Sequence, residues 1–289
     1  MDKQEVDSLT IERMVHNAIA VDGVDFRRSN REILAGYLRD EGGHEKLVET
    51  TFAFIDTHKE NADPLIRERA HKTEAAIYAA VPFILQPHDI TYLWLDAAQE
   101  TDGSVRAAIQ STMGTIIDKR FDLVTPETVK EITKTVITED RWNARILVGQ
   151  NLDLVLRKEE SRGRIVSVSP VLAMFRQAMG HTHPEVRKNV INGCDCLVPF
   201  AGPEHMNTLA ALIVGPAIFD DEPDVRRCGQ QATEDAIYKN PSMVMPIARY
   251  IKEREAAAAR SPQTVIELSR TKKACRNGMA ALTDALFPK

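Results

Sequence analysis

An arginine recurs in this chain at a nearly constant interval of about 40 residues. The six copies are Arg27, Arg67, Arg106, Arg145, Arg187 and Arg226, which lie 40, 39, 39, 42 and 39 residues apart. A fixed period of this length is the sequence signature of a repeat architecture, in which each copy is one supersecondary unit that stacks on its neighbours. The chain is therefore expected to fold as a row of similar units.

The residues after each arginine have the apolar spacing of an amphipathic helix. After Arg106, for example, Ile109, Met113 and Ile116 recur every three or four residues, as one buried stripe requires. Prolines stand at the expected first turn of three such helices, where a missing N–H costs nothing. They are Pro64, Pro184 and Pro223. The pattern predicts a helix start just before each arginine.

A second helical pattern lies between consecutive copies, as in PETVKEITKTVIT at 126–138. Alternation typical of strands is weak throughout the chain. Two antiparallel helices in a repeat of about 40 residues are typical of HEAT and armadillo-like helical arrays. We therefore predict an all-α fold, a HEAT-type α-solenoid of about six to seven antiparallel helix pairs in a right-handed superhelix.

No linker divides the sequence, which favours a single HEAT-repeat domain over residues 1–289. The approximate units are 3–40, 46–82, 88–120, 126–158, 164–199, 203–239 and 241–287. An irregular insertion is expected at 254–265, after which TKKACRNGMAALTDALFPK resumes as a basic amphipathic helix.

The repeated arginines are predicted to have a structural role. An apolar residue before each arginine would enter the core between units, while the planar guanidinium would stack along the inner face and bind an acidic residue of the turn. The predicted arginine ladder is Arg67, Arg106, Arg145, Arg187 and Arg226. The expected acidic partners are Asp63, Asp102, Asp140 and Asp221.

Composition and motifs favour a non-enzymatic cytoplasmic protein. The hydrophobic fraction of 43% and charged fraction of 27% suit a soluble globular chain, and no apolar run is long enough for a membrane helix. Phosphate-binding glycine loops and GxSxG are absent from the sequence. His181, His183, Cys194, Cys196 and His205 lack the paired spacing of zinc ligands. We expect no cofactor, metal or small-molecule substrate.

Charge is distributed unevenly along the chain. Residues 1–60 contain 8 Lys and Arg against 13 Asp and Glu, whereas residues 241–289 contain 9 against 4. The basic tail could meet phosphate, or both ends could be solvated helix faces. A HEAT-like DNA glycosylase, with Trp94 and Trp142 on a basic face, is a further alternative. The net charge of -5 argues against it.

The segment LVTPETVKEITKTVITEDRWNARILV resembles the HEAT region in the N-terminal part of fungal translation elongation factor three and of Gcn-type translational activators. In that family a turn with a Lys/Arg-Trp dipeptide joins a helix pair, as Arg141 and Trp142 would here. NPSMVMPIARYIKERE and TKKACRNGMAALTDAL are similar to later helices of the same region, so the resemblance covers about residues 100–289. It implies a non-enzymatic scaffold that contacts the ribosome; the family's ATP-binding cassettes are missing from this sequence.

A second resemblance is to tubulin-binding TOG domains, which are rods of six HEAT units that bind through the turns inside each unit. In this chain those turns would present Phe26 and Arg27 first, although a TOG domain typically offers Trp there. The candidate partner-binding residues are Arg141, Trp142, Lys188 and Arg227. Trp142 has two interpretations, a plug between two units or a contact residue. A structural subunit of a larger assembly is the third option for the whole chain.

Overall fold

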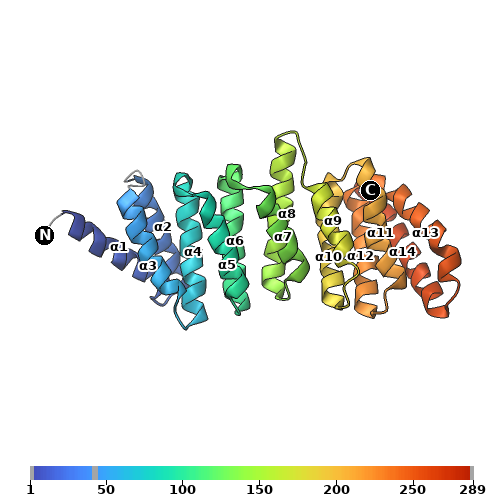
Figure 1. Cartoon of the computed structure of the whole chain (residues 1–289), viewed down its shortest axis with the longest axis horizontal. Coiled ribbons are helices and arrows are strands. Elements are labelled where there is room, and N and C mark those ends of the chain that lie inside the picture. The colour runs from blue at the N-terminus through green and yellow to red at the C-terminus, as the bar shows by residue number, and fades with distance from the viewer. Residues whose placement is uncertain (1–2, 41–44, 287–289) are drawn as a thin grey trace. The chain divides into compact units, whose positions relative to one another are not determined.

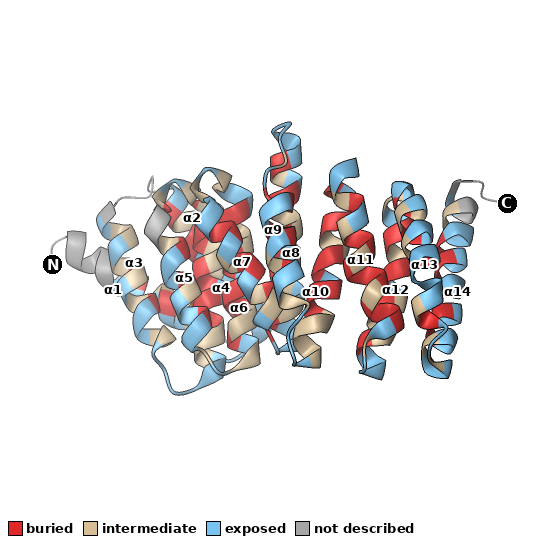
Figure 2. Cartoon of the chain, turned by 45° about the vertical axis from the view of Figure 1, so that its right-hand side comes forward, coloured by how far each residue is buried: buried red, intermediate tan, exposed pale blue. Residues whose placement is uncertain are grey.

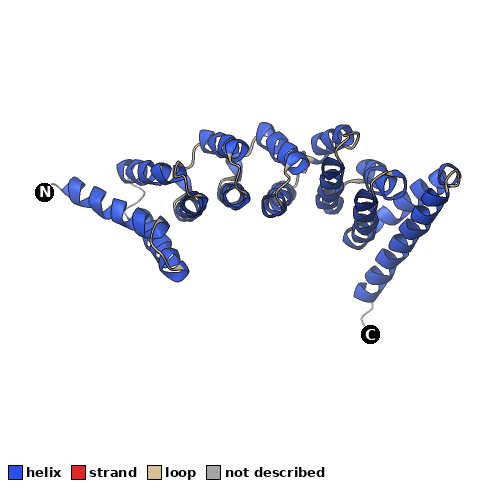
Figure 3. Ribbon diagram, turned by 90° about the horizontal axis from the view of Figure 1, so that it is seen from below, coloured by secondary structure: helices blue, strands red, loops and turns tan. Residues whose placement is uncertain are grey.

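The protein is all-α in the computed structural model, which describes residues 3–40 and 45–286. In these residues the chain forms fourteen α-helices and four short 3-10 helices, without a strand (Figure 3). None of the helices described is long and apolar enough to cross a membrane. The all-helical prediction is confirmed.

The helices follow one another with short connections. The first eight are α1 (Lys3–Ile19), α2 (Val24–Asp40), α3 (Glu45–Lys59), α4 (Pro64–Ala80), α5 (Pro87–Gln99), α6 (Gly103–Lys119), α7 (Pro126–Thr138) and α8 (Trp142–Ser161). The rest are α9 (Val168–Ala178), α10 (Pro184–Leu197), α11 (Pro203–Phe219), α12 (Pro223–Lys239), α13 (Val244–Ala258) and α14 (Pro262–Leu286). The 3-10 helices are η1 (Pro82–Ile84), η2 (Phe121–Leu123), η3 (Val198–Phe200) and η4 (Pro241–Met243).

The chain divides into two compact units. Unit 1 comprises Met1–Thr128 and Arg141–Val155, and unit 2 comprises Val129–Asp140 and Leu156–Lys289. The sequence indicated one domain without a linker. The boundaries fall inside α7, in the connection between α7 and α8, and inside α8.

Helix hairpins stack on one another within each unit. In unit 1, α1 packs against α2 and α3, and α4 packs against α2, α3 and α6 (Figure 1). In unit 2, α10 and α14 both pack against α12, while α9 and α13 both pack against α11. First helices therefore meet first helices, and second helices meet second helices, of adjacent hairpins.

Acidic side chains begin two of these helices. The Asp63 carboxylate accepts a hydrogen bond of 2.9 Å from Leu65 N, and Asp102 accepts from Ser104 N and Val105 N at 2.8 and 3.1 Å. Each carboxylate thus satisfies N–H groups that have no partner inside the helix. Asp63 and Asp102, which the sequence suggested as partners of the repeated arginines, thus cap their own helices.

The core of unit 1 lies between the stacked hairpins. Ile11, Leu34, Leu38 and Ile77, from α1, α2 and α4, are fully buried in one apolar cluster. Further along, Thr112 Oγ1 of α6 donates a hydrogen bond of 3.1 Å to the carbonyl of His71 in α4. Figure 2 shows buried residues concentrated along α4 and α6, so apolar contact stabilises the stack and the polar bond fixes its register.

The core of unit 2 includes close helix contacts at glycines. At Gly229 in α12, an added Cβ would lie 2.8 Å from the backbone N of Ala217 and 2.9 Å from the carbonyl oxygen of Ile213, both in α11. Asn189 of α10 also donates 3.0 Å to the carbonyls of Ile137 and Glu139. The close approach of the α11 backbone to Gly229 leaves no room for a Cβ and therefore requires glycine.

The irregular insertion expected at 254–265 is not present. Helix α13 continues through Ala258, and α14 begins at Pro262 after a turn of three residues. The run of alanines at 256–259 favours helix, which extends α13 beyond the predicted break. Proline is well suited to the first turn of α14, because its missing N–H would have no partner there.

We predict that Gly229→Ala lowers the free energy of unfolding by about 1–3 kcal/mol, because the new methyl group would overlap backbone atoms. Gly36→Ala in α2 is the matched control, since its Cβ would have only Arg39 Nη2 nearby, at 3.8 Å. That control should be neutral or more stable by about 0.5–1 kcal/mol. Urea unfolding measures both; equal stability of the two variants would contradict the close approach.

Candidate functional site

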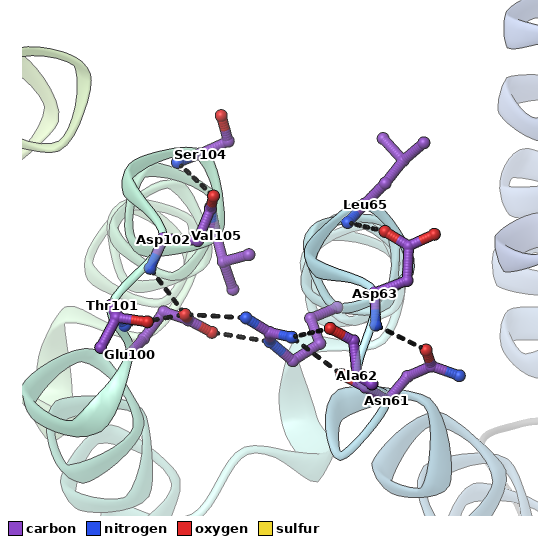
Figure 4. Close-up of polar contacts among 10 residues, drawn as sticks. Asn61, Ala62, Asp63, Leu65, Glu100, Thr101, Asp102, Ser104 and Val105 are labelled. Atoms are coloured by element: carbon purple, nitrogen blue, oxygen red, sulfur yellow. Dashed lines mark hydrogen bonds and ion pairs between the residues drawn. The ribbon is translucent and has the colours of Figure 1, made fainter.

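Arg67 joins two hairpins of unit 1 through four hydrogen bonds. Its Nε and Nη2 donate to the two carboxylate oxygens of Glu100, at 2.8 and 2.9 Å (Figure 4). Its Nη1 donates to the carbonyls of Asn61 and Ala62, at 2.8 and 3.1 Å. Glu100 follows the last residue of α5, so the guanidinium connects the start of α4 to the end of the next hairpin's first helix.

Arg187 repeats this geometry in unit 2. Its Nε and Nη2 bind the Asp220 carboxylate at 2.7 and 2.8 Å, and its Nη1 binds the carbonyls of His181 and Thr182 at 2.9 and 2.8 Å. In both copies the acid stands 33 residues after the arginine, and the carbonyls stand five and six residues before it. We call this four-bond arrangement of Arg67 and Arg187 the arginine clamp.

Other members of the predicted ladder share parts of the clamp. Arg226 Nη1 donates to the carbonyls of Asp220 and Asp221, at 2.6 and 2.9 Å, and its Nε lies 3.4 Å from Glu267 Oε1. The expected partner Asp221 therefore contributes its carbonyl and not its carboxylate. The backbone N–H of Arg106 donates to the carbonyl of Asp102 at 3.0 Å.

The acids of the clamp were not predicted from the sequence. Glu100 and Asp220 each stand directly after the first helix of the following hairpin, not in the turn that precedes the arginine. The expected partner Asp140, an exposed turn residue, precedes Arg145 and does not occupy such a position. An acidic residue 33 positions after both Arg67 and Arg187 is the signal that would have identified them, whereas Arg145 and Arg226 have alanine at that spacing.

The clamp keeps its carboxylates charged. Hydrogen bonds from Arg67 hold the pKa of Glu100 below its ordinary value. Burial would raise the pKa of Asp220, but the hydrogen bonds from Arg187 and from the Glu222 N–H outweigh it, so this pKa is also lowered. Arg67 and Glu100 bind each other, as do Arg187 and Asp220, so the clamp has a structural role.

A buried charge cluster in unit 1 was not predicted from the sequence. Glu74 of α4 accepts from Lys59 Nζ at 2.7 Å and from Tyr78 Oη at 3.3 Å on one oxygen, while His71 Nδ1 lies 3.2 Å from the other. Burial would raise the pKa of Glu74, yet the His71 and Lys59 interactions lower it. Both carboxylate oxygens are engaged, which indicates a structural role.

Trp142 is exposed at the start of α8. Its side chain is 65% accessible to solvent, and the Arg145 guanidinium lies over the ring at 5.5 Å from the centroid. The interpretation of Trp142 as a plug between units is therefore wrong. The preceding Arg141 lies along the start of α6, because a Cβ on Gly103 would be 3.5 Å from its side chain.

Two other helix starts in unit 1 also expose apolar side chains. Phe26 in α2 is 49% exposed and Leu65 in α4 is 46% exposed. Hydrogen bonds connect these regions: Arg69 Nη1 of α4 donates to the carbonyl of Ile19 at 3.2 Å, and the Arg67 clamp reaches Glu100. We define the turn edge of unit 1 as Phe26, Leu65 and Trp142. Trp94, in contrast, packs against the apolar core and is not part of an exposed face with Trp142.

Lys188 and Arg227 lie in unit 2 and form ion pairs within their own helices. Lys188 Nζ is 2.6 Å from Glu185 Oε1, and Arg227 pairs with Asp224. Cys228 Sγ lies 3.9 Å from the carbonyl of Lys188, so the two cations belong to adjacent helices, α10 and α12. They form a separate candidate surface from Trp142 and Arg141, which belong to unit 1.

Side chains that suggested chemistry have other roles. His205 Nε2 faces both Ser169 Oγ at 3.2 Å and Glu204 Oε1 at 3.3 Å, whereas a catalytic triad uses the two different ring nitrogens. His183 Nδ1 accepts from Glu185 N at 3.3 Å and caps α10. In the part of the chain that the structure describes, no group of three His, Cys, Asp or Glu side chains could hold a metal ion.

No protein-family model matches this chain, and no curated protein matches it. Similar solved structures include three crystal structures of engineered proteins from the Northeast Structural Genomics Consortium. The first is 12% identical, with a TM-score of 0.41, and covers 95% of this chain and 71% of its own. The second is 11% identical, with a TM-score of 0.43, and the match covers 76% of this chain and 96% of the other. The third is 11% identical, with a TM-score of 0.34, and the match covers 93% of this chain and 97% of the other.

We predict that Asp220→Asn lowers the free energy of unfolding at pH 7 by about 1.5–3 kcal/mol, because the charged clamp is lost. Since the folded-state pKa of Asp220 is lowered, its stabilisation is present above the ordinary value of about 3.9 and is lost as pH falls through the folded-state pKa. The variant should therefore lose less stability than wild type below about pH 4.

The control for this prediction is Asp224→Asn, which removes an exposed carboxylate four residues further along, in the first turn of α12. Chemical unfolding from pH 7 to pH 2 gives the free energies. Parallel pH profiles of wild type and Asp220→Asn would contradict the clamp.

Proposed function

We propose that this chain is a non-enzymatic HEAT-type scaffold that binds a macromolecular partner through the turn edge of unit 1. Its helix pairs would continue as a right-handed α-solenoid of six to seven units. The arginine clamp supports this reading, because it occurs in both units with the same spacing of 33 residues between the arginine and its acid. A repeated interaction of this kind specifies a shape, and solenoids present such shapes as extended binding surfaces.

The observation that carries the proposal is the exposed Trp142 with Arg145 over its ring. A cation–π contact restrains the indole, so less side-chain entropy is lost when a partner covers it. Trp and Arg are also the residues that most often dominate interface energetics. Phe26 and Leu65 add exposed apolar surface to the same edge. Burial of such side chains favours a protein surface as the partner.

The ribosome is the first candidate partner. The resemblance of residues 100–289 to ribosome-associated HEAT regions motivates it, together with the basic segment at 241–289. A ribonucleoprotein offers both protein surfaces for the turn edge and phosphate for the basic segment. The chain would then act in the cytoplasm as a translation-associated scaffold.

Tubulin is the second candidate, and the exposure of Phe26 favours it. TOG domains, which the sequence also resembles, place an aromatic residue in the first turn, and Phe26 is an exposed aromatic residue near the start of α2. The turn edge of unit 1 would be the tubulin-facing edge. A structural subunit of a larger assembly would use the same edge with another protein.

We predict that Trp142→Ala weakens co-sedimentation with ribosomes at low salt by at least about tenfold, since hot-spot truncations cost about 2 kcal/mol or more. The melting temperature should stay within about 2 °C of wild type, because the side chain is exposed. Phe83→Ala in η1 is the matched control, an exposed aromatic residue outside the turn edge. Absence of wild-type protein from the ribosome pellet would discard the ribosome, and a large drop in melting temperature would mark Trp142 as a packing residue.

Gel filtration with tubulin distinguishes the two partners. If the partner is tubulin, wild-type protein should co-elute with tubulin in gel filtration, and both Phe26→Ala and Trp142→Ala should abolish co-elution. Free elution of the wild-type chain would remove tubulin as a candidate.

A further inference from the structure

An open groove lies between α13 and α14 in unit 2. Its volume is about 610 Å³, and its lining includes Ala248, Ile251 and Cys275 together with four charged side chains. The charged residues are Lys252, Glu255, Lys272 and Arg276. None of these residues belongs to the turn edge of unit 1.

The floor of the groove is apolar and uncharged. Ile251 and Cys275 are buried beneath it, while Ala248 is exposed. Burial raises the pKa of the Cys275 thiol, so the sulfur is protonated and neutral near pH 7. The floor can therefore receive apolar side chains of a ligand but offers little to a phosphate.

The rim of the groove is cationic. Lys252 projects from α13, and Lys272 and Arg276 project from α14, four residues apart and hence on one helix face. Lys272 Nζ also contacts Glu255 Oε1 across the groove at 2.7 Å. Three cations against one carboxylate leave the rim positive, so it complements an acidic ligand.

We propose that this groove binds an acidic amphipathic helix of a partner protein. Apolar side chains on one face of that helix would cover Ala248 and Ile251, and its carboxylates would meet Lys252, Lys272 and Arg276. This is the helix-in-groove mode of peptide recognition, in which apolar anchors recur every three to four residues. The site is distinct from the turn edge and would act as a second contact.

A nucleic acid fits the groove less well. Phosphate binding is driven by neutralisation of charge and gains nothing from an apolar floor. Glu255 would also repel a phosphate backbone, whereas a partner helix can place a neutral or basic residue opposite it. An amphipathic peptide uses both the floor and the rim.

The test uses the full chain and a fluorescein-labelled peptide of 14 residues, with leucine on one helical face and glutamate elsewhere. Fluorescence anisotropy at low salt should show saturable binding. Lys272→Glu should weaken binding by at least about tenfold, as expected for charge reversal at a close contact. Ala248→Trp should also weaken binding by about tenfold, because the indole fills the groove without changing its charge.

Lys119→Glu, an equal charge change in α6, is the matched control and should change affinity less than about twofold, because Lys119 does not line the groove and exposed charges are screened by salt. If Lys272→Glu proves unstable by circular dichroism, Arg276→Gln replaces it, since Arg276 is exposed. Trp142→Ala should retain peptide binding, so failure of the turn edge and failure of the groove are separable.

Two outcomes would overturn the proposal. The first is no saturable peptide binding, or binding that Ala248→Trp leaves unchanged. The second is preferential binding of a 12-nucleotide uridine oligomer that Lys272→Glu weakens and Ala248→Trp does not, which would assign the rim to phosphate.

Discussion

The arginine clamp is the interaction on which the stacking of hairpins depends. In each full copy, one guanidinium binds two carbonyls of its own turn and both oxygens of an acid in the next hairpin. The planar fork of arginine can make these four bonds at once, whereas the single ammonium of lysine cannot. Because the acid directly follows the last residue of a helix, the clamp fixes the position of that helix end relative to the start of the helix that carries the arginine. Apolar burial stabilises the stack, and the clamp selects its register.

The sequence predicts helix starts and the arginine register well, because capping residues, prolines and apolar spacing are local signals. It does not predict Glu100 and Asp220 as partners, since these acids meet the arginines only after hairpins stack. The insertion at 254–265 was expected because the repeat pattern weakens there, but the alanine run keeps α13 helical. The side of the turn on which Trp142 lies is set by packing, so spacing alone could not distinguish a plug from an exposed contact.

Repetition separates structural residues from candidate functional ones. The clamp arginines recur and are saturated by partners in the chain, so they build the fold. Trp142 is singular and exposed, and only Arg145 is shown over its ring. The groove between α13 and α14 combines an apolar floor with a cationic rim. The two surfaces differ in chemistry, so the proposed scaffold would contact separate features of its partners through them.

A double-mutant cycle on Arg67 and Glu100 tests the central claim most directly. The free energies of unfolding of wild type, Arg67→Ala, Glu100→Ala and the double variant give the coupling between the two side chains. With both side chains largely buried and joined by two hydrogen bonds, the expected coupling is about 1–3 kcal/mol. A coupling indistinguishable from zero would contradict the clamp as the interaction that connects successive hairpins.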